Sequence, residues 1–164
     1  MDVVLIRDAT PADWAAIWPF LKEIVAAGET YTLPRDITED WARGRWLAPP
    51  PARAVVAVDG DTVVGTAKFG ANHLGPGSHI GTASFLVHPD HGGKGIGRAL
   101  GEHVIAQARA AGFRAMQFNA VVSTNTRAVG LWRSLGFEII ATLPAGFHHA
   151  TLGYVDLHIM FRKL

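Results

Sequence analysis

The residues best suited to chemistry form a glycine-rich loop in the middle of the chain. Four glycines lie between positions 92 and 97, and Lys94 and Arg98 lie among and beside them. Glycine has no Cβ, so a ligand can approach the backbone closely, and the first N–H groups of a helix have no partner within that helix. Such a loop suits a phosphate or pyrophosphate. The alternative is a glycine-rich turn that only reverses the chain.

Two elements must position this loop. The segment 83–87 is apolar and β-prone, and Pro89 ends it. From Ile96 onward, apolar residues recur at the spacing of one helix face. The order is therefore strand, loop, helix, which places the glycines at a helix N-terminus.

Neither of the common nucleotide-binding loops fits this stretch. The Gly-x4-Gly-Lys-Ser/Thr loop requires glycine five positions before Gly93 and a hydroxyl residue after Lys94, but His88 and Gly95 stand there. The dinucleotide pattern requires glycine or alanine at its sixth position, which here is Arg98 or a leucine.

Two motifs resemble those of the GCN5-related N-acetyltransferases. The first family signature is Gln/Arg-x-x-Gly-x-Gly/Ala after a strand that ends in a Val-x-Pro-like turn, and it is matched at 87–89 and 95–97. The second, Asn-x-x-Ala-x-x-Leu-Tyr-x-x-x-Gly-Phe, is matched at 125–137. Two positions depart from the signatures, because Gly92 stands in the Gln/Arg position and Trp132 in the tyrosine position. The resemblance covers nearly the whole chain.

The resemblance implies one N-acetyltransferase domain over residues 1–164. Its fold would be three-layer α/β/α, with a central mixed, mostly antiparallel sheet splayed between the fourth and fifth strands. Periodicity and turn signals predict the same kind of α/β architecture, in the order β-α-α-β-β-β-α-β-α-β-β. The expected strands are 3–6, 54–58, 62–69, 79–87, 113–122, 137–142 and 154–161, and the expected helices are 10–27, one after Thr38, 96–112, and one capped at 123–125. The tryptophans at helical spacing are expected in the core, and His148 and His149 in a surface loop.

Composition narrows the function classes. The chain has 15 basic and 14 acidic residues and no cysteine. Disulfides, thiolate metal sites and a cysteine nucleophile are therefore excluded, and no overall field favours nucleic acid or anionic lipid. His88 and His91 lack a third ligand nearby, so no metal is expected. The N-terminus carries only four consecutive apolar residues, too few for a signal segment, so we expect a cytoplasmic protein without nucleic-acid or membrane partners.

Acetyl-CoA is the cosubstrate that the resemblance implies. Its pantetheine arm would lie along the splayed strand and reach Asn125, and its pyrophosphate would lie on the loop amides. The cofactor-binding residues implied in this way are Phe85, Leu86, Val87, Gly92, Gly93, Lys94, Gly95, Ile96, Gly97, Arg98 and Asn125.

The catalytic and acceptor residues follow from finer similarities. Family members often use the tyrosine that is Trp132 here as a general acid, so other groups must assist; the candidates are Asn119, Ser123 and Thr82. No carboxylate lies on strand 79–87, which leaves His79 or a water chain to Glu29 as a substitute base.

The acceptor itself is predicted from two similar subgroups. The segment 29–32 resembles the substrate loop of phosphinothricin-type acetyltransferases, and 116–125 is similar to the fungal acetyltransferases of azetidine-2-carboxylate. Glu29, Tyr31, Thr82 and Asn119 are therefore expected to bind the substrate. The predicted activity is acetyl transfer to the amine of a small molecule, an amino acid or its analogue. The alternative is a non-catalytic CoA-binding or sensing module, and a homodimer is compatible with either.

Overall fold

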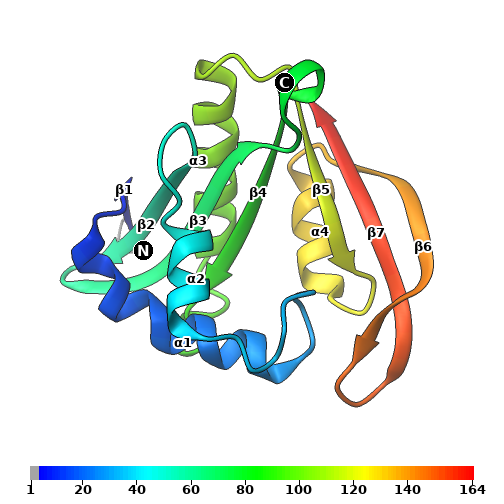
Figure 1. The fold of residues 1–164 in the computed structure, drawn as a ribbon, viewed down its shortest axis with the longest axis horizontal. Coiled ribbons are helices and arrows are strands. Elements are labelled where there is room, and N and C mark those ends of the chain that lie inside the picture. The colour runs from blue at the N-terminus through cyan, green and yellow to red at the C-terminus, as the bar shows by residue number, and fades with distance from the viewer. Residues whose placement is uncertain (1–3) are drawn as a thin grey trace.

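A seven-stranded mixed sheet forms the centre of the protein (Figure 1). The computed structural model describes residues 4–164, so the first residue of the expected strand 3–6 lies outside the described residues. The strands follow the spatial order β1-β2-β3-β4-β5-β7-β6. Their bounds are β1 Leu5–Asp8, β2 Arg53–Asp59, β3 Thr62–Ala71, β4 Ile80–Val87, β5 Ala115–Val122, β6 Glu138–His149 and β7 Gly153–Lys163.

The sheet opens between β4 and β5. These two strands run parallel and pair only where they begin, at Ile80 with Ala115 and Gly81 with Met116. Every other neighbouring pair of strands is antiparallel. Beyond Gly81 the two strands diverge (Figure 1). This confirms the mixed sheet and the splay between the fourth and fifth strands.

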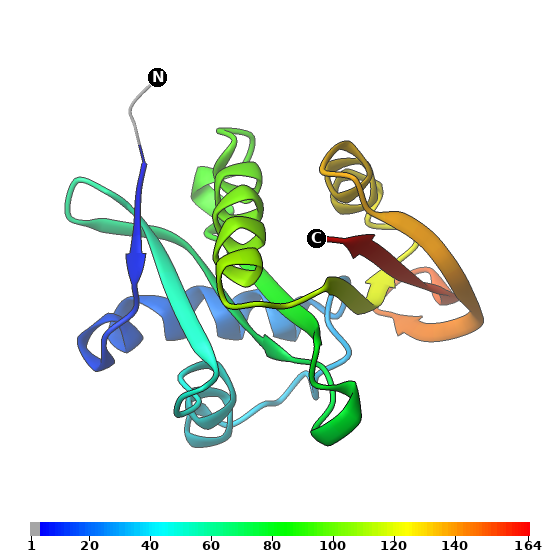
Figure 2. The same cartoon turned by 90° about the horizontal axis from the view of Figure 1, so that it is seen from above.

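Four α-helices cover the two faces of the sheet, which makes three layers (Figure 2). On one face, α3 (Ile96–Ala110) and α4 (Thr126–Ser134) share one hydrophobic cluster with sheet residues that include Val55 and Ala57 of β2 and Phe118 of β5. On the other, α1 (Trp14–Ala27) and α2 (Glu39–Trp46) pack against Val56 and Leu86. Consecutive residues of β2 serve opposite faces because side chains alternate along a strand.

The structure corrects three expectations about the elements. The strand expected to end at 142 continues as β6 to His149, past a register shift between Leu143 and Phe147 where Ala145 adopts a φ of 52°. His149 is therefore not in a surface loop: it is buried, and its Nδ1 accepts hydrogen bonds from two backbone N–H groups of the turn that follows. Trp41 is 45% exposed and not in the core, where the other helical tryptophans pack or partly pack.

None of the helices among residues 4–164 is both long and apolar enough to cross a bilayer.

Candidate functional site

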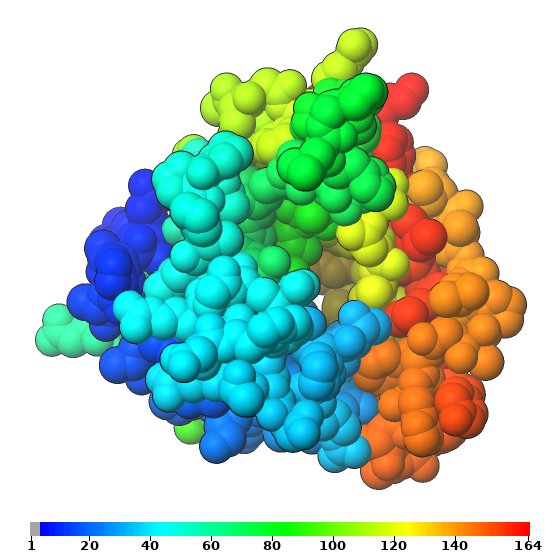
Figure 3. All heavy atoms as spheres, viewed as in Figure 1, coloured from blue at the N-terminus to red at the C-terminus, as the bar shows by residue number. Residues whose placement is uncertain are grey.

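A cavity of about 440 Å³ lies where β4 and β5 separate. Its walls come from 82–87 of β4, 118–122 of β5, the segment 30–33 between α1 and α2, and side chains of α2 and β3. Figure 3 shows the surface hollowed between these strands. Because the strands do not pair beyond Gly81, the backbone of β4 that faces β5 has no strand partner there.

The glycine loop follows β4 and leads into α3. Gly93 and Gly95 have φ values of 77° and 78°, which other residues rarely adopt, so the loop requires glycine at both positions. Within residues 4–164, the backbone N–H groups from Gly92 to Arg98 donate no hydrogen bond to protein acceptors. A Cβ added at Gly95 would meet nothing within 4 Å, so the space beside the loop is open. These unpaired donors at a helix N-terminus fit a pyrophosphate.

The two cations beside the loop differ in their surroundings. Arg98 is held on the protein, because its Nη2 donates to Ser134 Oγ at 2.6 Å and its Nη1 lies 3.5 Å from Glu102 Oε1. Lys94 takes part in none of the ion pairs among the described residues. Of the two, Lys94 is therefore the one available to a bound anion.

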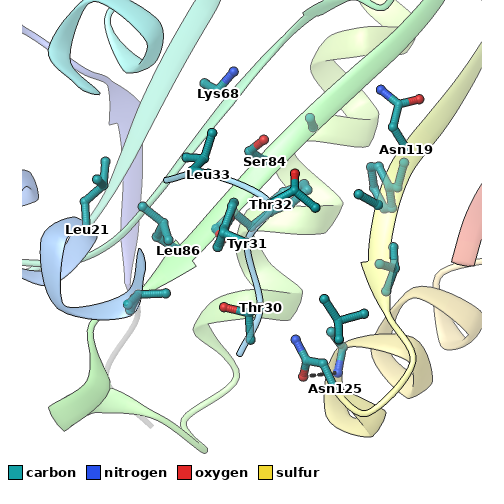
Figure 4. A pocket seen from close by; sticks show the side chains of 18 of the residues that line it. Leu21, Thr30, Tyr31, Thr32, Leu33, Lys68, Ser84, Leu86, Asn119 and Asn125 are labelled. Carbon is teal, nitrogen blue, oxygen red and sulfur yellow. Dashed lines mark hydrogen bonds between the residues drawn. The ribbon is translucent and has the colours of Figure 1, made fainter. Parts of the chain in front are cut away.

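Asn125 has two roles in the structure. It caps α4, since its Oδ1 accepts a hydrogen bond from the Ala128 N–H at 3.3 Å. It also lines the cavity, at the end of β5 (Figure 4).

Asn119 lies on β5 at the edge of the cavity and is held by a second asparagine. Asn119 Nδ2 donates to Asn72 Oδ1 at 2.7 Å, and Asn72 Nδ2 donates back to Asn119 Oδ1 at 3.2 Å. Gln117 Nε2 also donates to Asn119 Oδ1, at 2.9 Å. The register of β5 against β7 shifts between Phe118 and Val121, so Asn119 lies in a bulge, a feature that often redirects side chains.

The other expected site residues divide into two groups. Thr82 and Tyr31 line the cavity, and the Tyr31 hydroxyl donates a hydrogen bond to the Phe85 carbonyl of β4. Burial raises the pKa of Tyr31 well above its usual range, so the phenol stays neutral. Glu29 and Ser123 are not among the lining residues: Glu29 is exposed, and the Ser123 backbone N–H bonds to the Asp156 carbonyl.

Lys68 and Arg45 bring positive charge to the cavity wall, from β3 and α2 respectively. Burial, and then the charge of Arg45, lower the pKa of Lys68. Lys68 Nζ lies 5.9 Å from the centre of the Trp46 ring, and neither cation is in an ion pair among residues 4–164. Sequence reasoning missed both cations; the available signal was a charged lysine within the mostly apolar strand 63–69.

Aromatic side chains form the floor between β4 and α4. Trp132 is buried, and the centre of its ring lies 4.6 Å from the centre of the Phe85 ring and 4.8 Å from that of the Phe118 ring. An indole N–H is not a useful acid, so the position serves packing and shape instead of proton transfer. His79, the other candidate base, is exposed and is not a lining residue.

Comparisons with known proteins agree with this geometry. Residues 15–137 match the model of the acetyltransferase (GNAT) family. The L-amino acid N-acyltransferase MnaT of Escherichia coli is 35% identical over 144 residues, which cover 85% of this chain and 82% of that protein. The N-acetyltransferase aca1 of Schizosaccharomyces pombe is 36% identical over 114 residues, covering 68% of this chain but only 54% of aca1.

Solved structures show the same fold. A GCN5-related N-acetyltransferase from Kribbella flavida has a TM-score of 0.95 and 52% identity, with 98% of each chain covered. A phosphinothricin acetyltransferase from Sinorhizobium meliloti, solved in complex with acetyl-CoA, has a TM-score of 0.90 and 27% identity, covering 100% of this chain and 89% of that one.

Proposed function

The chain belongs to the acetyltransferase (GNAT) family and is an acetyl-CoA-dependent N-acetyltransferase, and from this premise we propose that it acetylates the amine of a free amino acid or a small amino-acid analogue. We take residues 1–164 to act as one catalytic domain. The names of its relatives support this acceptor class, since MnaT is an L-amino acid N-acyltransferase.

The observation that carries the proposal is the pair of cations on the cavity wall. Lys68 and Arg45 line a partly apolar cavity and have no carboxylate partner among the described residues. Lys68 is half-buried, whereas Arg45 is exposed. A partly desolvated cation without a counterion is costly, and a bound carboxylate would reduce that cost for Lys68. An amino acid carries a carboxylate beside its amine, whereas a polyamine would add further positive charge.

The chain supports acyl transfer chiefly by placing its reactants. Acetyl-CoA supplies a thioester that a neutral amine can attack. On the side of β4 that faces β5, residues 85–87 offer backbone groups without a strand partner to the pantetheine arm, although the Phe85 carbonyl already accepts the Tyr31 hydroxyl. An N–H of this strand can stabilise the oxyanion that develops. Asn119 and Thr82 orient the acceptor amine beside it, and orientation of this kind lowers the barrier strongly. The carbon–nitrogen bond forms, the carbon–sulfur bond breaks, the CoA thiolate leaves, and the amine proton passes to solvent.

Four acceptors, two of which form a matched pair, test the proposal. Release of free CoA thiol is measured with methionine, methioninamide, a tripeptide and spermidine. We expect turnover with methionine and a rise in KM of about 10-fold or more with methioninamide, because the amide cannot pair with a cation. Equal or better turnover of the amide, the peptide or the polyamine would overturn the amino-acid assignment.

We also propose that the protein is a cytoplasmic homodimer. The cytoplasmic location is supported by the cosubstrate, because the cytoplasm supplies acetyl-CoA.

The dimer is supported by the outer edge of the sheet. The edge strand β6 and its hairpin with β7 carry exposed large apolar side chains, and an exposed strand edge readily pairs with another chain. These side chains are Ile140, Leu143, Leu152 and Tyr154. Sedimentation equilibrium should give twice the chain mass, and about the single mass for Ile140→Lys; a monomeric wild-type protein would overturn the dimer.

A further inference from the structure

Position 92 lacks the side chain that the family signature places there, and its backbone does not explain why. Gly92 has φ −64° and ψ 153°, an ordinary extended conformation that any residue adopts. Gly93, by contrast, has φ 77° and requires glycine. The absence of a side chain at 92 therefore leaves space that something else can use.

Arg127 of α4 occupies that side of the loop. A Cβ added at Gly92 would lie 3.7 Å from Arg127 Nη1, and one added at Gly93 would lie 3.3 Å from Arg127 Nη2. A glutamine or arginine at 92 would extend toward the place where the guanidinium lies. Arg127 is exposed and belongs to none of the ion pairs among residues 4–164.

We propose that Arg127 binds the pyrophosphate of acetyl-CoA, in place of the Gln/Arg side chain that the signature has at position 92. The inference rests on the assignment of the glycine loop to acetyl-CoA. A planar guanidinium can donate two parallel hydrogen bonds to a phosphate, which suits it to this task. Asn125, two residues earlier, lines the cavity, so the start of α4 serves both the pantetheine and the pyrophosphate parts of the cosubstrate.

Calorimetric titration with three ligands locates the contact. Arg127→Ala should weaken binding of acetyl-CoA and of 3′-dephospho-CoA about 10-fold each. Binding of acetyl-pantetheine, which has no phosphate, should be unchanged. The matched control is Arg133→Ala, an exposed arginine of the same helix for which the structure shows no loop contact; it should bind all three ligands as the wild type does.

A second variant tests the replacement itself. Gly92→Gln in the Arg127→Ala background should recover most of the lost affinity, because the glutamine returns a hydrogen-bond donor to the same place. Affinity of Arg127→Ala for acetyl-CoA within twofold of wild type would overturn the proposal. So would an equal loss with acetyl-pantetheine, which would indicate displacement of Asn125 and α4. A wild-type protein that binds no acetyl-CoA would instead refute the loop assignment itself.

Discussion

The two ends of the cleft are built from different chemical groups. At the loop end, the donors are backbone N–H groups from Gly92 to Arg98, held by local turns that only glycine adopts at two positions. At the acceptor end, side chains from separate elements converge: Lys68 of β3, Arg45 of α2, and Asn119 of β5. A backbone site tolerates most side-chain changes but not a change of backbone, whereas a side-chain site can lose a single group and keep its shape. Variants at the two ends should therefore fail in different ways.

The largest effect is expected at the loop end, from Gly95→Asp. The substitution forces a residue with a Cβ into φ 78° and places a carboxylate beside the pyrophosphate, so acetyl-CoA affinity should fall by more than about 100-fold. Gly60→Asp is the matched control, because Gly60 has φ 59° with open space around it in the turn between β2 and β3. Calorimetry measures both variants. Affinity of Gly95→Asp close to that of the Gly60 variant would refute the loop assignment.

The next effect is expected at the acceptor end, from Lys68→Met. Loss of this cation should raise KM for the amino acid about 10-fold and leave KM for acetyl-CoA unchanged. Lys22→Met is the control, since Lys22 is exposed on α1 and outside the cavity lining. Steady-state kinetics with each substrate varied separates the two constants. A rise in both KM values would indicate that the cavity wall has moved.

The pH dependence of KM sharpens this test. Burial and Arg45 lower the pKa of Lys68, so this side chain loses its charge at a lower pH than an ordinary lysine does. The cation is present below that pKa and is lost as pH rises through it. KM for the amino acid should therefore rise on the alkaline side in the wild type, and Lys68→Arg should remove that rise. A rise that persists unchanged in the arginine variant would assign it to another group, such as the substrate amine.

An effect of similar size, on kcat instead of KM, is expected from Asn119→Ala. Because Asn119 lies at the cavity edge, its loss should lower kcat about 10-fold while acetyl-CoA affinity changes little. Asn72→Ala removes only the partner that holds Asn119, through two hydrogen bonds, and should cost less. Equal losses of kcat and of cosubstrate affinity would mean that Asn119 holds only the cosubstrate or the fold.

The conformation of the loop end was predictable from sequence, whereas only part of the acceptor end was: Tyr31, Thr82 and Asn119 were expected there, but the two cations were not. The conformation of the loop depends on its own residues, because the positive φ angles at Gly93 and Gly95 favour glycine at those positions. Lys68 and Arg45 reach the cavity, and Asn72 reaches Asn119, only through packing of distant elements. A lysine in a strand pattern is most simply interpreted as a solvent-facing residue. Arg127 was missed for the same reason, since it comes near Gly92 and Gly93 from α4, an element that follows β5 further along the chain.

The order of helices and strands along the chain followed from periodicity and turn signals. The errors lie where an element contains residues that break its own pattern. The segment 143–146 contains proline and glycine and reads as the end of a strand. In the structure, the chain absorbs these residues in a register shift, and pairing resumes from Phe147 to His149 against β7. The strand resumes after the register shift because its residues pair with β7 again. A pattern within residues 138–149 alone does not show this pairing with a later strand. The prediction for Trp41 was wrong because helical spacing shows which residues share a helix face but not whether another element packs on that face. In the structure, Arg45 Cζ lies over the Trp41 ring, 4.8 Å from its centre.

The smallest effect is expected from Tyr31→Phe, at the point where the two ends meet. The Tyr31 hydroxyl donates to the Phe85 carbonyl of the splayed strand, and burial keeps that phenol neutral across the working pH range. Its removal costs one neutral hydrogen bond, so kcat/KM should fall less than about 10-fold, with an unchanged pH profile. Kinetics of the variant across pH 6 to 10 (about the usable range) measures both. A changed pH profile would show that Tyr31 transfers a proton. Tyr31 would then be a general acid at the acceptor end, in place of the family tyrosine whose position is occupied by Trp132 here. The two ends of the cleft would in that case differ in proton transfer as well as in binding groups.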